Sequence, residues 1–65
     1  MKIGNRIREL RHQNKLSQEQ FAHICDLDRT YIASIELGKR NVSIVNLEKI
    51  ANAFDIKLSE FFEGL

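Results

Sequence analysis

The chain has 65 residues, of which 43% are hydrophobic, and its formal net charge is +1. A chain of this length buries only about 60% of its unfolded surface, so we expect one small domain over residues 1–65 and no dinucleotide-binding or barrel fold. Proline is absent. Cys25 is the single cysteine, and this excludes a disulfide framework and a paired-cysteine zinc site. No apolar run is long enough to cross a membrane and the first residues lack a secretory signal, so we expect a cytoplasmic protein with no membrane partner.

The charge is distributed unevenly along the chain. Residues 1–45 contain eight lysines and arginines against five acids, a net charge of +3, whereas residues 46–65 contain two against four, a net charge of −2. This asymmetry permits a basic face on a nearly neutral protein.

The predicted elements are short helices. The first covers about residues 3–14, where apolar residues recur at helical spacing. Ser17 followed by Gln20 has the spacing of a capping box and predicts the start of a second helix. We expect this helix to end near Asp26, because aspartate tolerates a left-handed backbone conformation. Its expected buried residues are Phe21, Ala22 and Ile24.

Three further helices follow. Asp28 is a good N-cap for a third helix that runs to about Leu37, and Gly38 is suited to end it. Ser43 is the expected N-cap of a fourth helix, and a short fifth helix begins near Ser59. The expected apolar stripe of the fourth helix consists of Ile44, Leu47, Ile50, Ala51 and Phe54. No strand pattern is evident, so the predicted fold is all-α with five helices.

The second and third helices, with the short turn between them, predict a helix-turn-helix over about residues 17–38. At 100° per residue, the third helix turns Tyr31, Ile32 and Ile35 toward the core. Its outward face carries no acid and consists of Arg29, Thr30, Ala33, Ser34 and Leu37. Short side chains let a helix lie deep in the major groove, where an arginine can form two hydrogen bonds to guanine. We therefore expect double-stranded DNA to be the partner.

Several segments resemble the phage-repressor-like (Cro/repressor, XRE-type) helix-turn-helix family, and the resemblance covers almost the whole chain. These segments are Leu16-Ser17-Gln18-Glu19-Gln20-Phe21-Ala22, Leu27-Asp28-Arg29-Thr30-Tyr31-Ile32, Ile35-Glu36-Leu37-Gly38-Lys39-Arg40-Asn41, Leu47-Glu48-Lys49-Ile50-Ala51 and Leu58-Ser59-Glu60-Phe61-Phe62. The short length and the Leu-Asp-Arg-Thr-Tyr-Ile run are most similar to the controller proteins of bacterial restriction–modification systems. Many relatives have glycine where this chain has Asp26.

The resemblance implies a compact five-helix, lambda-repressor-like domain that binds duplex DNA as a symmetric dimer and regulates transcription. The residues that it places at base edges are Arg29, Thr30 and Ser34. The residues that it places at phosphates are Gln18, Lys39, Arg40, Asn41 and Ser43. It also implies a structural ion pair between Arg11 and Glu36. The hydroxyl of Tyr31 is a further candidate for a phosphate contact, with packing at the edge of the core as the alternative.

The final third of the chain has more apolar side chains than the small core can absorb. We expect these to contribute to a homodimer interface, with the alternative that Phe61 and Phe62 both belong to the core. The interface candidates are Leu58, Phe61, Phe62 and Leu65. Two recognition helices in successive major grooves would lie ~34 Å apart, which predicts an inverted-repeat operator.

No catalytic motif is present, and neither His12 nor His23 has a metal-ligating partner at suitable spacing, so we expect no enzyme activity, no cofactor and no metal. No effector domain fits in the chain, so the expected signal is the protein's own concentration rather than a small molecule. Two other functions remain open: a helix-turn-helix antitoxin or protein-interaction module, and the DNA-binding domain of a longer repressor. The sequence does not indicate whether binding activates or represses.

Overall fold

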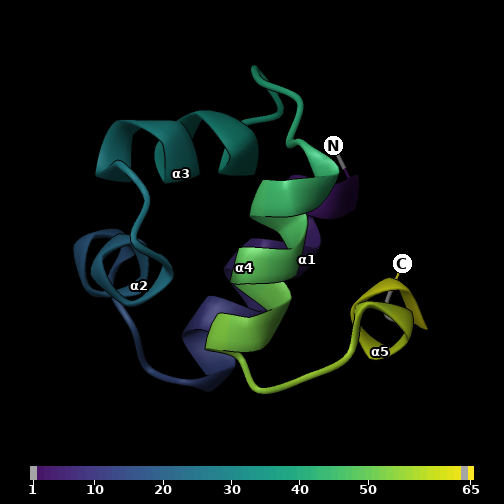
Figure 1. Ribbon diagram of the computed structural model, residues 1–65. Helices are drawn as coiled ribbons and strands as arrows, with labels where there is room; N and C mark the ends of the chain where they lie inside the picture. The colour runs from purple at the N-terminus through teal and green to yellow at the C-terminus, as the bar shows by residue number, and fades with distance from the viewer. Residues whose placement is uncertain (1, 64) are drawn as a thin grey trace.

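Five α-helices make up the fold, as a computed structural model that describes residues 2–63 and 65 shows (Figure 1). They are α1 (Lys2–Gln13), α2 (Gln18–Cys25), α3 (Arg29–Glu36), α4 (Ile44–Ala53) and α5 (Leu58–Glu63). The described residues contain no strand, so the prediction of an all-α fold is confirmed. The predicted helix boundaries agree with the observed ones to within one or two residues.

The predicted N-caps begin three of the helices. The Ser17 hydroxyl accepts a hydrogen bond from the amide of Gln20 (3.0 Å), and the Gln20 side chain accepts one from the amide of Ser17 (2.9 Å), which completes the capping box. The Asp28 carboxylate caps α3, and the Ser43 hydroxyl caps α4 by accepting from the amide of Asn46 (3.2 Å). Each cap satisfies a backbone donor that the first turn of a helix leaves free.

Four helices end in the same way, with one residue in the left-handed conformation. These residues are Lys15 (φ 56°), Asp26 (59°), Gly38 (75°) and Asp55 (57°). In each case the next amide bonds back to a carbonyl five residues earlier, as in Leu27 to Ala22 (2.9 Å). After α1, α2 and α4 the residue that follows is apolar and packs against the core. The chain thus reverses direction at a helix end and buries a side chain in the same step.

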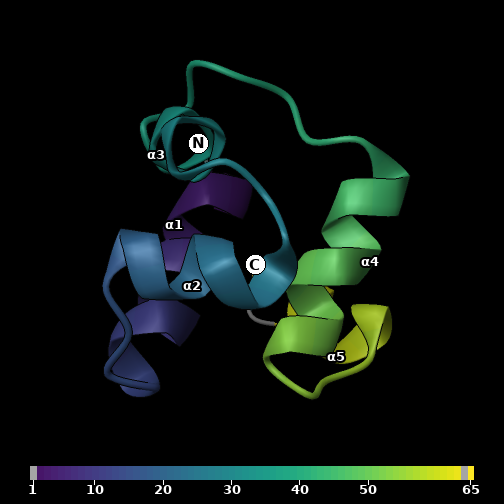
Figure 2. The same ribbon diagram turned by 60° about the vertical axis from the view of Figure 1, so that its left-hand side comes forward.

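The core lies between the helices: α2 packs against α3 and α4, α1 packs against α3, and α5 packs against α4. In Figure 1 α1 lies behind α4, and Figure 2 shows α2 in front of α1. The core contains the stacked pair Phe21 and Phe54, whose ring centroids are 4.5 Å apart. Cys25 is also buried, and desolvation raises the pKa of its thiol to about 12, so the thiol is protonated at neutral pH. The buried hydrophobic residues are Ile7, Leu10, Phe21, Ala22, Cys25, Ile32, Ile35, Leu47, Ile50, Ala51, Phe54 and Phe61.

Two residues that the sequence assigned to the core are exposed. Ile24 is 52% exposed, because α2 turns Phe21, Ala22 and Cys25 inward and leaves Ile24 beside the buried face. Ile44 is 66% exposed although it lies three residues before the buried Leu47. It is the first residue of α4, which extends beyond the edge of the core at that end. Both predictions of burial are therefore wrong.

Arg6 of α1 joins α5 to α1 through hydrogen bonds. The guanidinium of Arg6 donates to the backbone carbonyls of Phe61 (2.8 Å) and Glu60 (3.1 Å), and it pairs with Glu9 (2.9 Å). The same group lies 5.9 Å from the centroid of the Phe61 ring. The last turn of a helix has free carbonyl groups, and Arg6 satisfies two of them from a distant part of the sequence.

Candidate nucleic-acid interface

The outer surface of α3 carries the residues expected at base edges. Arg29 and Thr30 are exposed and Ser34 is half-buried, whereas Ile32 and Ile35 on the inner side are fully buried. Helix α2 packs against α3 and lies below it in Figure 2, and the two are joined by the turn at residues 26–28. The buried side of α3 holds the helix against the core and leaves its polar side open to a partner.

The side chain of Thr30 is oriented by Asp28. The Asp28 carboxylate accepts hydrogen bonds from the Thr30 amide (2.8 Å) and from the Thr30 hydroxyl (2.6 Å), and these bonds lower the pKa of that carboxyl from its ordinary value of 3.8. The hydroxyl hydrogen is thereby used within the protein. Thr30 presents only an acceptor oxygen and a methyl group, which suit an amino group of adenine or cytosine, or the methyl group of thymine.

A basic loop follows α3. Lys39, Arg40 and Asn41 are exposed in the segment that joins α3 to α4, at the upper edge of the molecule in Figure 1. Ser43 is also exposed, and its hydroxyl oxygen accepts the capping bond of α4. The loop therefore places two cations and two polar side chains beside the outer face of α3. A phosphate backbone would run there if α3 lay in a major groove.

Tyr31 is half-buried between α3 and α4. Its hydroxyl oxygen accepts a hydrogen bond from the side-chain amide of Asn46 (3.1 Å), and the guanidinium of Arg40 lies 4.8 Å from the centroid of its ring. These groups border an open hollow of about 400 Å³ between the starts of α3 and α4. Its lining residues are Leu27, Asp28, Thr30, Tyr31, Arg40 and Asn46. Asn46 was not among the residues expected from the sequence, because only the fold brings it to Tyr31.

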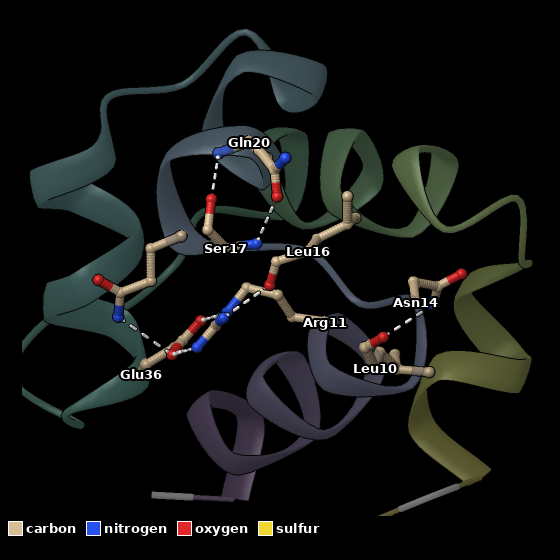
Figure 3. A network of polar contacts seen from close by, with 8 residues as sticks. Leu10, Arg11, Asn14, Leu16, Ser17, Gln20 and Glu36 are labelled. Atoms are coloured by element: carbon tan, nitrogen blue, oxygen red, sulfur yellow. Dashed lines mark hydrogen bonds and ion pairs between the residues drawn. The ribbon is translucent and has the colours of Figure 1, made fainter.

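Gln18 donates to a buried ion pair at the other end of α3. Figure 3 shows the two members of this pair, Arg11 and Glu36. Arg11 binds Glu36 with two hydrogen bonds, from Nε to Oε2 (2.8 Å) and from Nη2 to Oε1 (3.0 Å), and it also donates to the carbonyl of Leu16 (2.8 Å). The Gln18 amide donates to Glu36 at 3.2 Å. An amide nitrogen has two hydrogens, so Gln18 retains one for an external acceptor such as a phosphate.

The candidates for the dimer interface are separated from this surface. In both views α5 lies on the opposite side of the molecule from α3 (Figures 1 and 2). Phe62 and Leu65 are 41% and 47% exposed, and Leu58 is half-buried. Phe61 is fully buried, so its side chain is not available to an interface. For Phe61 the alternative prediction, that it belongs to the core, is the correct one.

None of the helices described is long and apolar enough to cross a membrane. Within residues 2–63 and 65 no group of three histidine, cysteine or acidic side chains is placed to hold a metal ion.

Helices α2 and α3 pack together and are joined by a short turn, and α3 has an exposed polar face. This arrangement defines a helix-turn-helix protein, and the buried ion pair of Arg11 and Glu36 supports it from within. The helix-turn-helix family model matches residues 7–61. The chain belongs to this family, and its relatives include control proteins of restriction–modification systems.

Two comparisons illustrate the similarity to these proteins. The control protein C.MunI of Mycoplasma sp is 54% identical over 100% of this chain and 89% of its own length. The crystal structure of the restriction–modification controller protein C.AhdI from Aeromonas hydrophila superposes with a TM-score of 0.89, at 51% identity, over 94% of this chain and 92% of that one.

A third comparison includes DNA. The structure of the controller protein C.Esp1396I, a tetramer in complex with its natural 35 base-pair operator, superposes with a TM-score of 0.88 at 37% identity. The match covers 95% of this chain and 82% of that one.

Proposed function

We propose that this chain is a sequence-specific double-stranded DNA-binding transcriptional regulator, and that it is the control protein of a restriction–modification system. The observation that carries this proposal is the outer face of α3, where Arg29 and Thr30 are exposed beside a basic loop. The similarity to C.MunI and C.AhdI supports the biological role. The role is one of binding rather than catalysis.

In the proposed complex α3 lies in the major groove and Arg29 donates two hydrogen bonds to a guanine. Thr30 and Ser34 contact neighbouring base edges. The phosphate contacts come from both sides of the groove: Gln18 at the start of α2, and Tyr31, Lys39, Arg40, Asn41 and Ser43 on the other side. These contacts fix the register of the protein on the duplex, whereas Arg29, Thr30 and Ser34 read the sequence.

One recognition helix contacts few base pairs, so we propose that the chain binds as a homodimer on an inverted repeat. Two copies of α3 in successive major grooves double the readout. The tetramer of C.Esp1396I on its operator supports the assembly of more than one dimer on a natural site. The proposed contact between the two copies consists of Leu58 and Phe62 of α5 and of Leu65, which follows α5. Regulation then follows the concentration of the protein in the cytoplasm, without a small-molecule effector.

Selection of bound sequences from a random duplex library tests the proposal. We expect an inverted repeat whose half-sites are about one helical turn apart. The Arg29→Ala variant should bind the selected duplex more weakly by about 1–3 kcal/mol per half-site and lose its preference at one base pair of each half-site. A folded wild-type protein that enriches no sequence would contradict the proposed function. Uniform weakening of Arg29→Ala on all sequences would place Arg29 at the phosphate backbone instead.

A further inference from the structure

We infer that Asn46 is a positioning residue for DNA binding, because it orients the Tyr31 hydroxyl toward a phosphate of the DNA backbone in the hollow between α3 and α4. The inference rests on the proposed function and adds a residue that lies on α4, outside the helix-turn-helix.

The first step is the hydrogen-bond inventory of Tyr31. A phenolic hydroxyl has one hydrogen to donate and oxygen lone pairs to accept with. The Asn46 amide donates to the oxygen at 3.1 Å, so this bond uses a lone pair and leaves the hydrogen free. Among the described residues no acceptor takes that hydrogen. The Tyr31 hydroxyl is thus a donor without a partner in the protein.

The second step is the surroundings of that donor. Tyr31 and Asn46 line the hollow between α3 and α4, together with Arg40 and Asp28. The Asp28 carboxylate is engaged by Thr30 at 2.6 Å and 2.8 Å, whereas the Arg40 guanidinium lies over the Tyr31 ring, 4.8 Å from its centroid. The Tyr31 hydroxyl, which is a neutral donor, and the Arg40 guanidinium, which is a cation, therefore lie next to each other in the wall of the hollow. An acceptor with a negative charge, such as a phosphate oxygen, suits this pair.

The third step is rigidity. The Tyr31 ring is half-buried, the Arg40 guanidinium stacks on its face and Asn46 holds its hydroxyl. The phenol therefore has little rotational freedom left to lose when DNA binds. A donor that is already oriented costs less to use than one that must be ordered on binding. Asn46 contributes to affinity through Tyr31 and not through a contact of its own.

A double-mutant cycle on the full chain tests the inference, with a labelled duplex that carries the selected site as the probe. We expect Tyr31→Phe to weaken binding by about tenfold per half-site and Asn46→Ala by about fourfold, since hydrogen bonds to charged groups are among the stronger ones. In the Tyr31→Phe background the Asn46→Ala substitution should have no further effect, because the hydroxyl that it orients is gone. Asn52→Ala is the matched control, because Asn52 is exposed six residues further along α4.

A spectroscopic measurement separates positioning from a purely structural role. Tyr31 is the single tyrosine of the chain, so fluorotyrosine places one ¹⁹F label in the protein. We expect its resonance to shift when the duplex binds, and this shift to be reduced in Asn46→Ala but unchanged in Asn52→Ala. Circular dichroism melting verifies that each variant is folded.

Two results would overturn the inference. Additive losses in the double mutant would mean that Asn46 contacts DNA by itself, and full affinity of a folded Asn46→Ala variant would mean that the bond only joins α3 to α4. Either result leaves the proposed function intact, because that function fails only if the wild-type protein has no preferred duplex.

Discussion

The Cα atom of Gly4 faces the backbone carbonyl of Ile35, and a Cβ atom at this position would collide with the Ile35 oxygen. It would also lie only 3.0 Å from the Cα atom of Glu36. Both obstacles are backbone atoms of α3, so they cannot move aside as a flexible side chain can. Helices α1 and α3 therefore approach each other closely because residue 4 has no side chain.

We expect Gly4→Ala to lower the free energy of unfolding by about 1–3 kcal/mol, despite the better helix propensity of alanine, because it forces α1 and α3 apart. Urea denaturation measures the loss. Asn5→Ala is the control, because Asn5 is exposed on the same turn and should change stability little. Equal stability of Gly4→Ala and wild type would show that the two helices can separate without cost.

The buried ion pair of Arg11 and Glu36 predicts a second stability effect. The two side chains are only 9% and 4% exposed, so removal of one leaves an unpaired buried charge. We expect Glu36→Gln to cost about 3 kcal/mol, and the double variant Arg11→Met, Glu36→Leu to recover much of this loss. Thermal unfolding followed by circular dichroism measures both. Arg8→Met, at an exposed position of α1, should melt close to wild type; a double variant that melts below Glu36→Gln would contradict the prediction.

The left-handed residues at the helix ends predict a stabilising change. Lys15 has φ 56°, a conformation that costs an L-residue roughly 1–2 kcal/mol relative to glycine. We expect Lys15→Gly to raise the free energy of unfolding by about 0.5–1 kcal/mol, after subtraction of the greater entropy that glycine loses on folding. Gly38→Ala should have the opposite effect. Lys49→Gly serves as the control, because Lys49 is exposed in the interior of α4 and glycine there should only destabilise.

The basic loop predicts a change in the salt dependence of DNA binding. If Lys39 neutralises one phosphate in each subunit, Lys39→Gln should reduce the slope of log affinity against log salt concentration by about 1.8 for a dimer. Fluorescence anisotropy at several salt concentrations gives the slope. Lys57→Gln should leave it unchanged, because Lys57 lies in the turn between α4 and α5, away from α3 (Figure 1). An unchanged slope for Lys39→Gln would remove Lys39 from the phosphate contacts.

The exposed aromatic ring of α5 predicts the effect of a change at the dimer interface. Phe62 is 41% exposed beside the buried Phe61, so Phe62→Ser should leave the fold intact and remove apolar area from the contact between two copies. We expect the variant to be monomeric at concentrations at which the wild type is a dimer, as analytical ultracentrifugation would show. Ile24→Ser, which removes an exposed apolar residue from α2, should remain a dimer. A dimeric Phe62→Ser protein would place the interface elsewhere.

The starts and ends of the helices could be predicted because they depend on local chemistry. Ser17, Asp28 and Ser43 cap the amides two or three residues ahead, and Asp26 and Gly38 adopt the left-handed conformation within the same turn. A sequence contains this information directly, since the interacting groups are close together in the chain.

The direction of each side chain was harder to predict. Ile24 and Ile44 are apolar and lie within helices, yet the packing of α2 and α4 leaves both exposed. The bond from Asn46 to Tyr31 joins residues 15 positions apart, and the bond from Arg6 to Phe61 joins residues 55 positions apart. Periodicity describes one helix at a time and contains no information about which helix faces which. The exposed face of α3 was predictable because a single helix forms it.

The attachment of α5 by Arg6 has a practical consequence for experiments on this protein. Because Arg6 binds the carbonyls of Glu60 and Phe61, α1 is attached to α5 at one point and packs against α3 at another, Gly4. A fluorophore on α5 will therefore lie beside Phe62 and on the opposite side of the molecule from the groove-facing helix, where it can follow the association of subunits without touching DNA. A fluorophore on Lys2, two residues before Gly4, will instead lie near α3 and disturb DNA binding.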